Sequence, residues 1–422
     1  MNGALDGIKK KEATEKRISA AVELREGDRV PLSPLVHGFP FIRAGYTMAD
    51  ILYDDTLEKT KDAVLKYLRD YDPDLSVGLG SFNGMGKILE KMEPYNIVWP
   101  GKPGATISKN SIHQWIEFPL LLDDEFELFN RDRTGWSMNR AFPRMAKIFE
   151  CFKPLSFRDG YDSFSMFGLI NQLSAPQFRE QMQLMWEVSD MYASLMKKIS
   201  AFSAEMDAMG YPGYRDGGGR LTPYDHYNDF LRGSIAGMLD LYMNYDEIEK
   251  WCEENWLEVE QYIKSLPKGN GKQWFRMALH KGFDGFMNDQ HYEDLYWKYL
   301  RKMILAIIDS GRVPYVFTEG AYNTRLKFLS DVPKGKVIYH FEYVDMANAK
   351  KLLGDVACIS GGFNRVLLER ANKQEVIDET KRLLDICAPG GGFIFETDAG
   401  VDFAKEENFA AMIETVREYG QY

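Results

Sequence analysis

Glu319 and His340 carry the side chains best suited to chemistry, and each lies near the end of a short apolar run. The runs are PYVFTEG, which contains Glu319, and KVIYHFE, which contains His340. A carboxylate and an imidazole can supply two of the three protein ligands of a catalytic zinc ion. They can equally act as a general acid and a general base. The structural alternative is a carboxylate beside a helix start and a hydrogen-bonded core histidine.

The spacing of these residues predicts that they lie side by side. Glu319, His340 and Gly361 follow one another at intervals of 21 residues. Equal intervals indicate equivalent positions in successive strand–helix units, and parallel strands bring such positions to one edge, where ligands bind. We therefore predict that Glu319 and His340 form the catalytic pair and the core of a metal site.

Five further polar residues follow apolar runs in the same way and could complete this site. The candidates for a third metal ligand are His280, Glu342 and Glu396. The candidates for substrate binding are His280, Asn364 and Asp398. Each of these residues could instead have a structural role, as a core histidine, as a carboxylate at a helix start, or as the cap of the next helix.

The elements that must position these residues alternate between strand and helix. From 314 to 400, four apolar runs each stop at a polar or glycine-rich corner, with helical patterns between them. The run WFRMALH adds a fifth corner, and three runs in the first half bring the number of strands to eight. This pattern predicts an α/β fold, a (β/α)8 TIM barrel with long inserted loops. A doubly wound open sheet is the alternative, although no GxGxxG or GxxxxGK[ST] motif follows a first strand.

Helix signals mark four segments of the chain. Residues 373–387 have an apolar face and a capping box from Asn372 and Glu375. Residues 174–206 predict a long helix, opened by Ser174, whose methionine and aromatic stripe we assign to the core. Residues 404–419 predict the last helix. Residues 1–27 predict a polar helical extension on the outside, before a single domain at 28–422.

Composition narrows the class of protein. The net charge of −11 argues against a nucleic-acid surface, which needs a basic patch. No apolar run is long enough to cross a membrane, and the start lacks the apolar core of a signal peptide. The 4 cysteines form no CxxC pair, which favours a reducing compartment. We expect a cytoplasmic protein that binds neither nucleic acid nor membrane.

Several motifs together resemble the uroporphyrinogen decarboxylase superfamily, and within it the zinc-dependent, corrinoid-linked methyltransferases of anaerobic O-demethylases. The resemblance covers most of the chain and is most specific in the second half. It includes GYTMADILYDD, HQWIEFPLLLDDEFELFNRD, LHKGFDGFM, VPYVFTEGAYNTRL, VPKGKVIYHFE, LLGDVACISGG and GGGFIFETDAG.

The resemblance implies a TIM barrel with zinc on a Glu-x14-Glu-x20-His pattern. Glu319 and His340, with 20 residues between them, match the second and third ligands. Ile304 stands at the position of the first, so His280, Glu342 or Glu396 would complete the set. The decarboxylase motif RQAGRY is echoed only by IRAGYT, residues 42–47, which lacks the second arginine.

The implied activity is transfer of a methyl group from a methoxylated, aromatic small molecule to a corrinoid. The Co(I) corrinoid would be carried by a separate partner protein docked over the barrel mouth, and a homodimer is compatible with the pattern. Zinc would act as a Lewis acid on the ether oxygen. Tyr211, Tyr214 and Tyr224, in a long loop, could line an aromatic pocket. The alternatives are a decarboxylase-like lyase and a non-catalytic barrel that binds a tetrapyrrole or a corrinoid protein.

Overall fold

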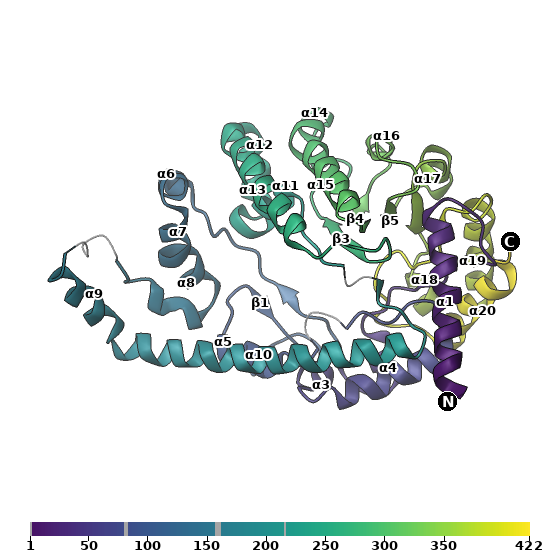
Figure 1. Cartoon of the computed structure of the whole chain (residues 1–422), viewed down its shortest axis with the longest axis horizontal. Coiled ribbons are helices and arrows are strands. Elements are labelled where there is room, and N and C mark those ends of the chain that lie inside the picture. The colour runs from purple at the N-terminus through teal and green to yellow at the C-terminus, as the bar shows by residue number, and fades with distance from the viewer. Residues whose placement is uncertain (1, 80–82, 157–161, 215–216) are drawn as a thin grey trace.

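Five parallel strands in the second half of the chain form the main sheet (Figure 1). The computed structural model describes residues 2–79, 83–156, 162–214 and 217–422. The strands stand in chain order, each paired with the next. Their bounds are β3 (Trp274–Leu279), β4 (Val313–Ala321), β5 (Ile338–Tyr343), β6 (Cys358–Gly361) and β7 (Phe393–Ile394).

Helices connect these strands, as the alternating pattern predicts. They are α14 (Asp289–His291), α15 (Lys298–Asp309), α16 (Leu326–Leu329), α17 (Met346–Leu353), α18 (Val366–Arg370), α19 (Lys373–Cys387) and α20 (Glu406–Tyr419). α19 has the predicted bounds, and its capping box joins Asn372 and Glu375. α20 begins two residues later than predicted. The α/β class is therefore confirmed.

The two faces of the sheet differ, because successive strand residues point to opposite sides. One face, with Phe275, Tyr339 and Ile359, belongs to the large core that includes the helices. The other face forms a second apolar cluster. Its strand members are Trp274, Val313, Tyr315, Phe317, Ile338, Cys358 and Ile394. We call this face the inner face of the sheet and its cluster the inner apolar cluster, most of which lies at the amino ends of the strands.

Segments before β3 continue the sheet through isolated bridges and single hydrogen bonds, not as the regular strands that we predicted. Parallel bridges join Leu32 to Phe395 and Val36 to Val401, which places residues 29–36 beside β7. Asp74 donates its N–H to the carbonyl of Leu32 (2.8 Å). At the other edge, a bridge joins Gly219 to Arg276 in β3.

These segments contain Pro31, Pro34, Pro73 and Pro212. Proline has no N–H to donate to a ladder, which explains isolated bridges in place of regular strands. The strands described before β3 are β1 (Ile97–Val98) and β2 (Gln114–Trp115), an antiparallel pair.

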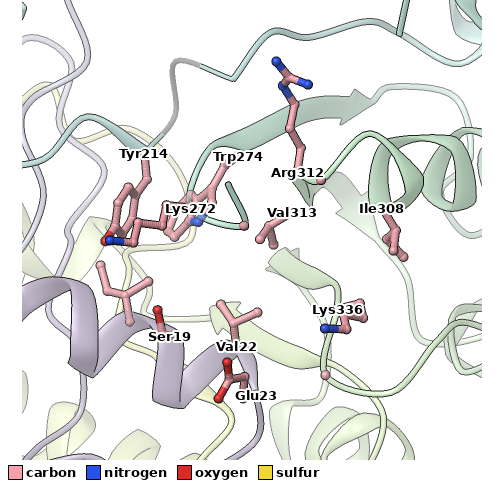
Figure 2. A pocket seen from close by; sticks show the side chains of 14 residues that line it. Ser19, Val22, Glu23, Tyr214, Lys272, Trp274, Ile308, Arg312, Val313 and Lys336 are labelled. Carbon is pink, nitrogen blue, oxygen red and sulfur yellow. The ribbon is translucent and has the colours of Figure 1, made fainter. Parts of the chain in front are cut away.

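The amino-terminal helix α1 (Asn2–Val22) lies against the amino ends of the strands, not on the outside as predicted. Ile18, Ala21 and Val22 belong to the inner apolar cluster. Figure 2 shows Ser19 and Val22 of α1 facing the start of β3 and β4.

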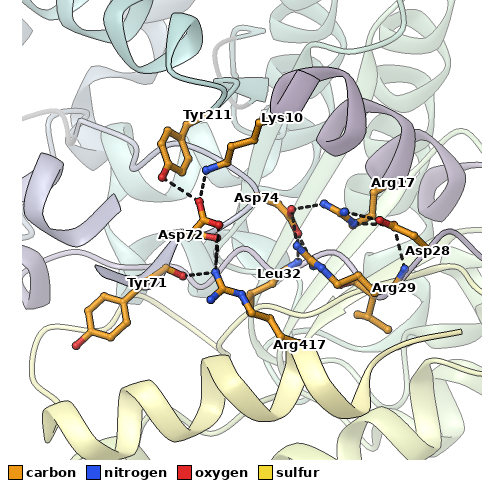
Figure 3. Close-up of polar contacts among 11 residues, drawn as sticks. Lys10, Arg17, Asp28, Arg29, Leu32, Tyr71, Asp72, Asp74, Tyr211 and Arg417 are labelled. Atoms are coloured by element: carbon orange, nitrogen blue, oxygen red, sulfur yellow. Dashed lines mark hydrogen bonds and ion pairs between the residues drawn. The ribbon is translucent and has the colours of Figure 1, made fainter. Parts of the chain in front are cut away.

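A polar network fastens α1 to the rest of the chain (Figure 3). Asp74 is buried and pairs with Arg17 of α1 (2.5 Å) and with Arg29 (2.9 Å). It also accepts the N–H of Leu32 (2.6 Å). Arg417 of α20 donates to the carbonyl oxygens of residues 71 and 72, so the two ends of the chain meet at this network.

The long helix α10 (Pro176–Ala208) runs along one side of the molecule, and α6 to α9 lie near its start, away from the main sheet (Figure 1). It begins at Pro176 without a side-chain cap, so Ser174 is not its cap. Its described buried residues are Leu195, Phe202 and Met206, whereas Trp186 and Tyr192 are exposed. Most of the stripe that we assigned to the core therefore faces outward.

The remaining helices surround these elements. They are α2 (Phe39–Arg43), α3 (Met48–Leu52), α4 (Glu58–Tyr71), α5 (Gly86–Met92), α6 (Phe126–Arg131), α7 (Arg133–Trp136), α8 (Phe142–Met145), α9 (Ser165–Leu173), α11 (Pro223–His226), α12 (Ser234–Met243) and α13 (Tyr245–Ser265). Across the described ranges, none of the helices combines the length and the apolar character that a membrane span requires.

Candidate functional site

Strand register places Glu319 and His340 at different depths on the inner face of the sheet. His340 of β5 pairs with Phe317 of β4, not with Glu319. Glu319 lies two residues farther along β4, in a stretch between Thr318 and Ala321 where the register is irregular and Ala321 pairs with Tyr343. The N–H of Gly320 in this stretch donates to the Glu342 carboxylate (2.7 Å). The expectation that Glu319 and His340 lie side by side is therefore corrected.

His340 is fully buried, and both of its ring nitrogens contact protein groups. Nδ1 lies 2.9 Å from the carboxylate of Glu396, and Nε2 lies 2.9 Å from the carbonyl oxygen of Asp398. The ring stacks on Phe317, with 4.5 Å between the ring centres. Glu396 is equally buried and accepts hydrogen bonds from Tyr315 (2.7 Å) and Ser360 (3.0 Å). His340 is thus a satisfied core histidine that orients the strands around it.

His280 and Glu319 face each other at the carboxyl ends of β3 and β4. Nε2 of His280 lies 3.7 Å from the Glu319 carboxylate. Nδ1 of His280 contacts the carboxylate of Asp229, which lies in a π-helical turn, Tyr227–Arg232. The side chain of His280 is 28% exposed and that of Glu319 is 43% exposed, so solvent and a ligand can reach both.

This arrangement keeps His280 charged. Burial opposes the charge, but the hydrogen bond to Asp229 and the carboxylates of Asp225 and Glu319 outweigh it and raise the pKa of His280 to about 9. Burial raises the pKa of Glu319, against the opposing charges of His280 and Arg276. A protonated imidazole beside a weakly acidic carboxyl group can donate a proton to a bound molecule.

Asp225 is a buried carboxylate close to His280. It is completely buried and accepts hydrogen bonds from Tyr296 (2.6 Å), from Thr222 (2.9 Å) and from the N–H of Lys281 (2.8 Å). Burial raises the pKa of Asp225 to about 6. Because its bond to Lys281 fixes the backbone next to His280, Asp225 acts as a positioning residue.

Sequence reasoning missed Asp225 and Asp229. Both lie in the helical stretch PYDHYND, four residues apart, and therefore on one face of that stretch. That spacing was the available signal.

A cavity of about 210 Å³ has Arg276 in its wall, and the charge of Arg276 acts on Glu319. Its wall is largely apolar, with Phe41, Met48, Ile51, Leu52 and Ile112. Its polar members are His37, Asn83, His113 and Arg276. Few convergent polar groups in an apolar cavity are typical of a small-molecule site.

Two polar groups of this cavity point to a ligand. Nδ2 of Asn83 is buried without a hydrogen-bond partner. Arg276 is exposed in the middle of β3, although its neighbours Phe275 and Met277 are buried. Its guanidinium group lies over the ring of Phe317, 5.4 Å from the ring centre. Arg276 therefore presents a positive charge between the cavity and Glu319.

Comparisons with known proteins agree with this architecture. The family model "Uroporphyrinogen decarboxylase (URO-D)" matches residues 239–419. The resemblance that the motifs indicated is thus confirmed over the part of the chain that holds β3 to β7.

A solved structure, the methyltransferase from Methanosarcina mazei, is similar to the whole chain. Its TM-score is 0.56 at 13% sequence identity, over 96% of this chain and 98% of that one. At this identity the likeness concerns the fold alone. No curated protein matches the sequence.

The other predicted residues of the URO-D domain have structural partners. Asp398 accepts hydrogen bonds from the backbone (3.2 Å) and the side chain (3.1 Å) of Arg365. Asn364 is exposed, and its side chain accepts the N–H of Val366 (3.0 Å), which forms a turn before α18. Their role in substrate binding stays a prediction.

The loop tyrosines do not meet in one pocket. Tyr211 donates to the carbonyl of Leu68 (2.8 Å), and Tyr214 lies against Trp274 at the amino end of β3. Tyr224 is buried and donates to the carbonyl of Gly237 (3.0 Å). Residues 215–216 of this loop lie outside the described residues.

The donors do not fit the zinc centre that we predicted. Within the described ranges, no three His, Cys, Asp or Glu side chains converge on a point where a metal ion could bind. Both nitrogens of His340 already contact protein atoms, and the ring lies a layer below Glu319. We therefore derive no chemical step through a metal ion.

Proposed function

We propose that this chain is a methyltransferase that takes a methyl group from a methoxylated aromatic compound and delivers it to the Co(I) corrinoid of a partner protein. The observation that carries the proposal is the charged His280, held by Asp229 and facing Glu319, together with Arg276, which acts on Glu319 and lines an apolar cavity. The match of residues 239–419 to the URO-D family model and the fold shared with the Methanosarcina mazei methyltransferase support it.

The architecture behind the proposal is an eight-membered barrel. In this barrel, the five strands are completed by residues 29–36, by residues 74–78, and by residues 212–214 with 217–219. The hydrogen bonds between Leu32 and Asp74 and between Ser76 and Pro212 support this arrangement, together with the bridges to β7 and β3. His280 and Glu319 would then lie at the mouth formed by the carboxyl ends of the strands, where such barrels bind substrate.

The proposed role of His280 is to protonate the leaving oxygen. When the O–CH₃ bond breaks, the oxygen keeps the bonding electron pair and takes a proton from Nε2 of His280. This removes the negative charge that would otherwise build up on a phenolate. Glu319, which is closer to solvent, returns a proton to His280 after the product leaves. Asp229 stabilises the charged imidazole before the step.

The cavity accounts for the substrate class. Phe41, Ile51 and Ile112 provide an apolar surface for an aromatic ring, and a cavity of about 210 Å³ suits one ring with small substituents. Arg276 could hold an anionic substituent, such as a carboxylate, by charge-assisted hydrogen bonds. Asn83 offers a further hydrogen bond.

The methyl acceptor belongs to the partner. A Co(I) corrinoid supplies the nucleophile that attacks the methyl carbon. A corrin ring is far larger than this cavity, so it would have to approach from outside the mouth. That requirement agrees with a corrinoid carried by a separate protein.

The lyase alternative is less well supported. A decarboxylase that binds several substrate carboxylates would need a cluster of arginines. Arg43, which lies in the matching IRAGYT segment, pairs with Asp70 (2.8 Å) and Glu406 (3.2 Å) instead. Arg276 is the arginine that lines the described cavity.

The test is a single-turnover assay with the full chain, 4-methoxybenzoate and a free Co(I) corrinoid. We expect loss of the Co(I) absorption band and formation of 4-hydroxybenzoate. His280→Ala should lower the rate by roughly 100-fold or more, the usual contribution of a general acid. Lys327→Met, a change at an exposed residue, is the control. Release of carbon dioxide without methyl transfer would favour the lyase instead.

A further inference from the structure

A second cavity, also of about 210 Å³, lies at the opposite end of the sheet from His280 and Glu319. We call it the amino-end pocket. It is enclosed by α1, by the starts of β3 and β4, and by the loop before β5 (Figure 2). The residues that matter for its chemistry are Val22, Tyr214, Trp274, Val313 and Lys336.

The wall of the amino-end pocket is apolar and rigid. Trp274 is buried and stacks on Tyr315, with 5.1 Å between ring centres and 6° between the planes. Val313 lies beside Trp274 on the neighbouring strand, and Val22 of α1 faces both (Figure 2). A cavity of roughly 150 Å³ with such walls holds benzene. The amino-end pocket is therefore large enough for one aromatic ring with two polar substituents.

The hydroxyl group of Tyr214 lacks a partner. Tyr214 is 6% exposed and lines the pocket, and its hydroxyl oxygen has no hydrogen-bond partner among the residues that the structure describes. Burial raises the pKa of Tyr214, so the group keeps its proton and remains a donor. Buried polar groups are nearly always hydrogen-bonded. A ligand oxygen would supply the partner that the protein does not.

The ammonium group of Lys336 lies on the other side of the pocket (Figure 2). Lys336 is exposed, and in the part of the chain that the structure describes it takes part in no ion pair. The three other charged side chains that line the pocket are engaged. Lys272 pairs with Glu15, and Glu23 pairs with Arg25. Arg312 donates to Ser310 and to the carbonyl of Pro267, and its guanidinium group points away from the pocket (Figure 2). The pocket thus offers a free cation at one end and a neutral hydroxyl donor at the other.

We propose that the amino-end pocket binds a small hydroxylated aromatic carboxylate, with the carboxylate at Lys336, the ring between Trp274 and Val22, and the hydroxyl group at Tyr214. The carboxylate, the ring and the hydroxyl group of such a ligand would lie in the same order as Lys336, Trp274 and Tyr214 across the pocket. The proposal is independent of methyl transfer at the mouth, because the pocket shares no residue with the cavity that Arg276 lines.

The experiment is isothermal titration calorimetry of the full chain with 4-hydroxybenzoate, benzoate and phenol. We expect saturable binding of 4-hydroxybenzoate, and affinities about tenfold lower for benzoate and phenol, which each lack one polar contact. Tyr214→Phe and Lys336→Met should each lower the affinity for 4-hydroxybenzoate about tenfold. Without ligand, Tyr214→Phe should be no less stable than the wild type, since it removes an unpartnered hydroxyl group.

Two control variants separate this pocket from the mouth. Lys334→Met changes an exposed lysine of the same loop that does not line the pocket, and Arg276→Met removes the positive charge of the cavity at the mouth. Both should bind 4-hydroxybenzoate at the amino-end pocket as the wild type does. The proposal is overturned if the wild type does not bind, if Tyr214→Phe and Lys336→Met bind unchanged, or if only Arg276→Met abolishes binding.

Discussion

At the residue scale, two histidines on the same sheet acquire opposite properties from their surroundings. His340 is enclosed, and its two nitrogens are occupied by Glu396 and the backbone of Asp398. His280 is held at one nitrogen by Asp229, while the other nitrogen faces Glu319 and solvent. A histidine that is to give up a proton needs one nitrogen within reach of the substrate. Accessibility therefore supports the proposed role of His280 as the proton donor, and favours a positioning role for His340.

The first prediction concerns the pH dependence of methyl transfer. Since the pKa of His280 is raised to about 9, we expect the rate to be constant near neutral pH and to fall as the pH rises through about 9. Asp229→Asn removes the main stabilising partner, so the pKa should fall toward its ordinary value and the rate should decline at lower pH. The measurement is a pH–rate profile under single-turnover conditions.

The control for this profile is Asp284→Asn, which changes a carboxylate bound to Thr324 and not to His280. An Asp229→Asn profile that overlays the wild type would show that His280 is not the titrating group. The linkage to stability has the same sign. The raised pKa contributes stability that is fully present below about pH 6.5 and is lost as the pH rises through about 9.

The second prediction concerns His340. His340→Ala should lower the free energy of unfolding by about 3–5 kcal/mol, because it leaves Glu396 buried without its partner. His340→Gln retains a donor near Glu396 and should lose less. Urea denaturation followed by circular dichroism measures both values. If His340→Ala abolished methyl transfer at unchanged stability, His340 would have to act directly on the substrate.

The sequence identified the right kinds of residue but not their depth in the sheet. Counting 21 residues between Glu319 and His340 ignores strand register, and the register pairs Phe317 with His340. Arg276 was missed because an arginine within a strand resembles an ordinary surface residue until the inner face of the sheet is known. Asp229 was missed because it arrives from a helix far away in the sequence.

At the scale of elements, local signals sufficed where neighbouring residues determine the structure. The capping box of Asn372 and Glu375 and the apolar period fixed α19 at both ends. Local signals did not determine the structure of the first half. Residues 29–36 and 74–78 there are held by single bridges and by partners distant in the chain. Such segments carry proline and have no regular ladder, so their place in the sheet is set by tertiary contacts.

The third prediction tests one of these contacts. Asp74 is 3% exposed and joins Arg17, Arg29 and the N–H of Leu32. Asp74→Ala should lower the free energy of unfolding by about 3 kcal/mol, since two guanidinium groups and a backbone donor lose their acceptor. Chemical denaturation provides the value.

The matched control is Asp28→Ala, which removes a carboxylate that also binds Arg17 but is 60% exposed. An exposed pair contributes less than about 1 kcal/mol. Equal losses in the two variants would mean that burial of Asp74 adds nothing, and that the network does not fix the segment beside Leu32.

At the scale of the whole molecule, the two ends of the chain close the structure around the sheet. α1 places Ile18, Ala21 and Val22 on the inner apolar cluster, and Arg417 of α20 binds the turn after α4. The N–H of Val30 donates to the carbonyl of Gly420 (2.8 Å), which joins the start of the sheet to the end of the chain. Neither end can leave without exposing core, so we expect the sheet and α1 to unfold as one unit.

The last prediction follows from this arrangement. Deletion of residues 1–27 should lower the melting temperature by on the order of 5–10 °C, because it exposes the apolar cluster around Trp274 and removes Arg17 from Asp74. Deletion of residues 1–5, which ends at the exposed Leu5, is the control and should leave the melting temperature unchanged. The shorter chain should also lose binding at the amino-end pocket, since Val22 forms part of its wall. Equal melting temperatures for the two deletions would mean that α1 is an appendage after all, and the burial of Ile18 and Val22 would then contribute little to the stability of the sheet.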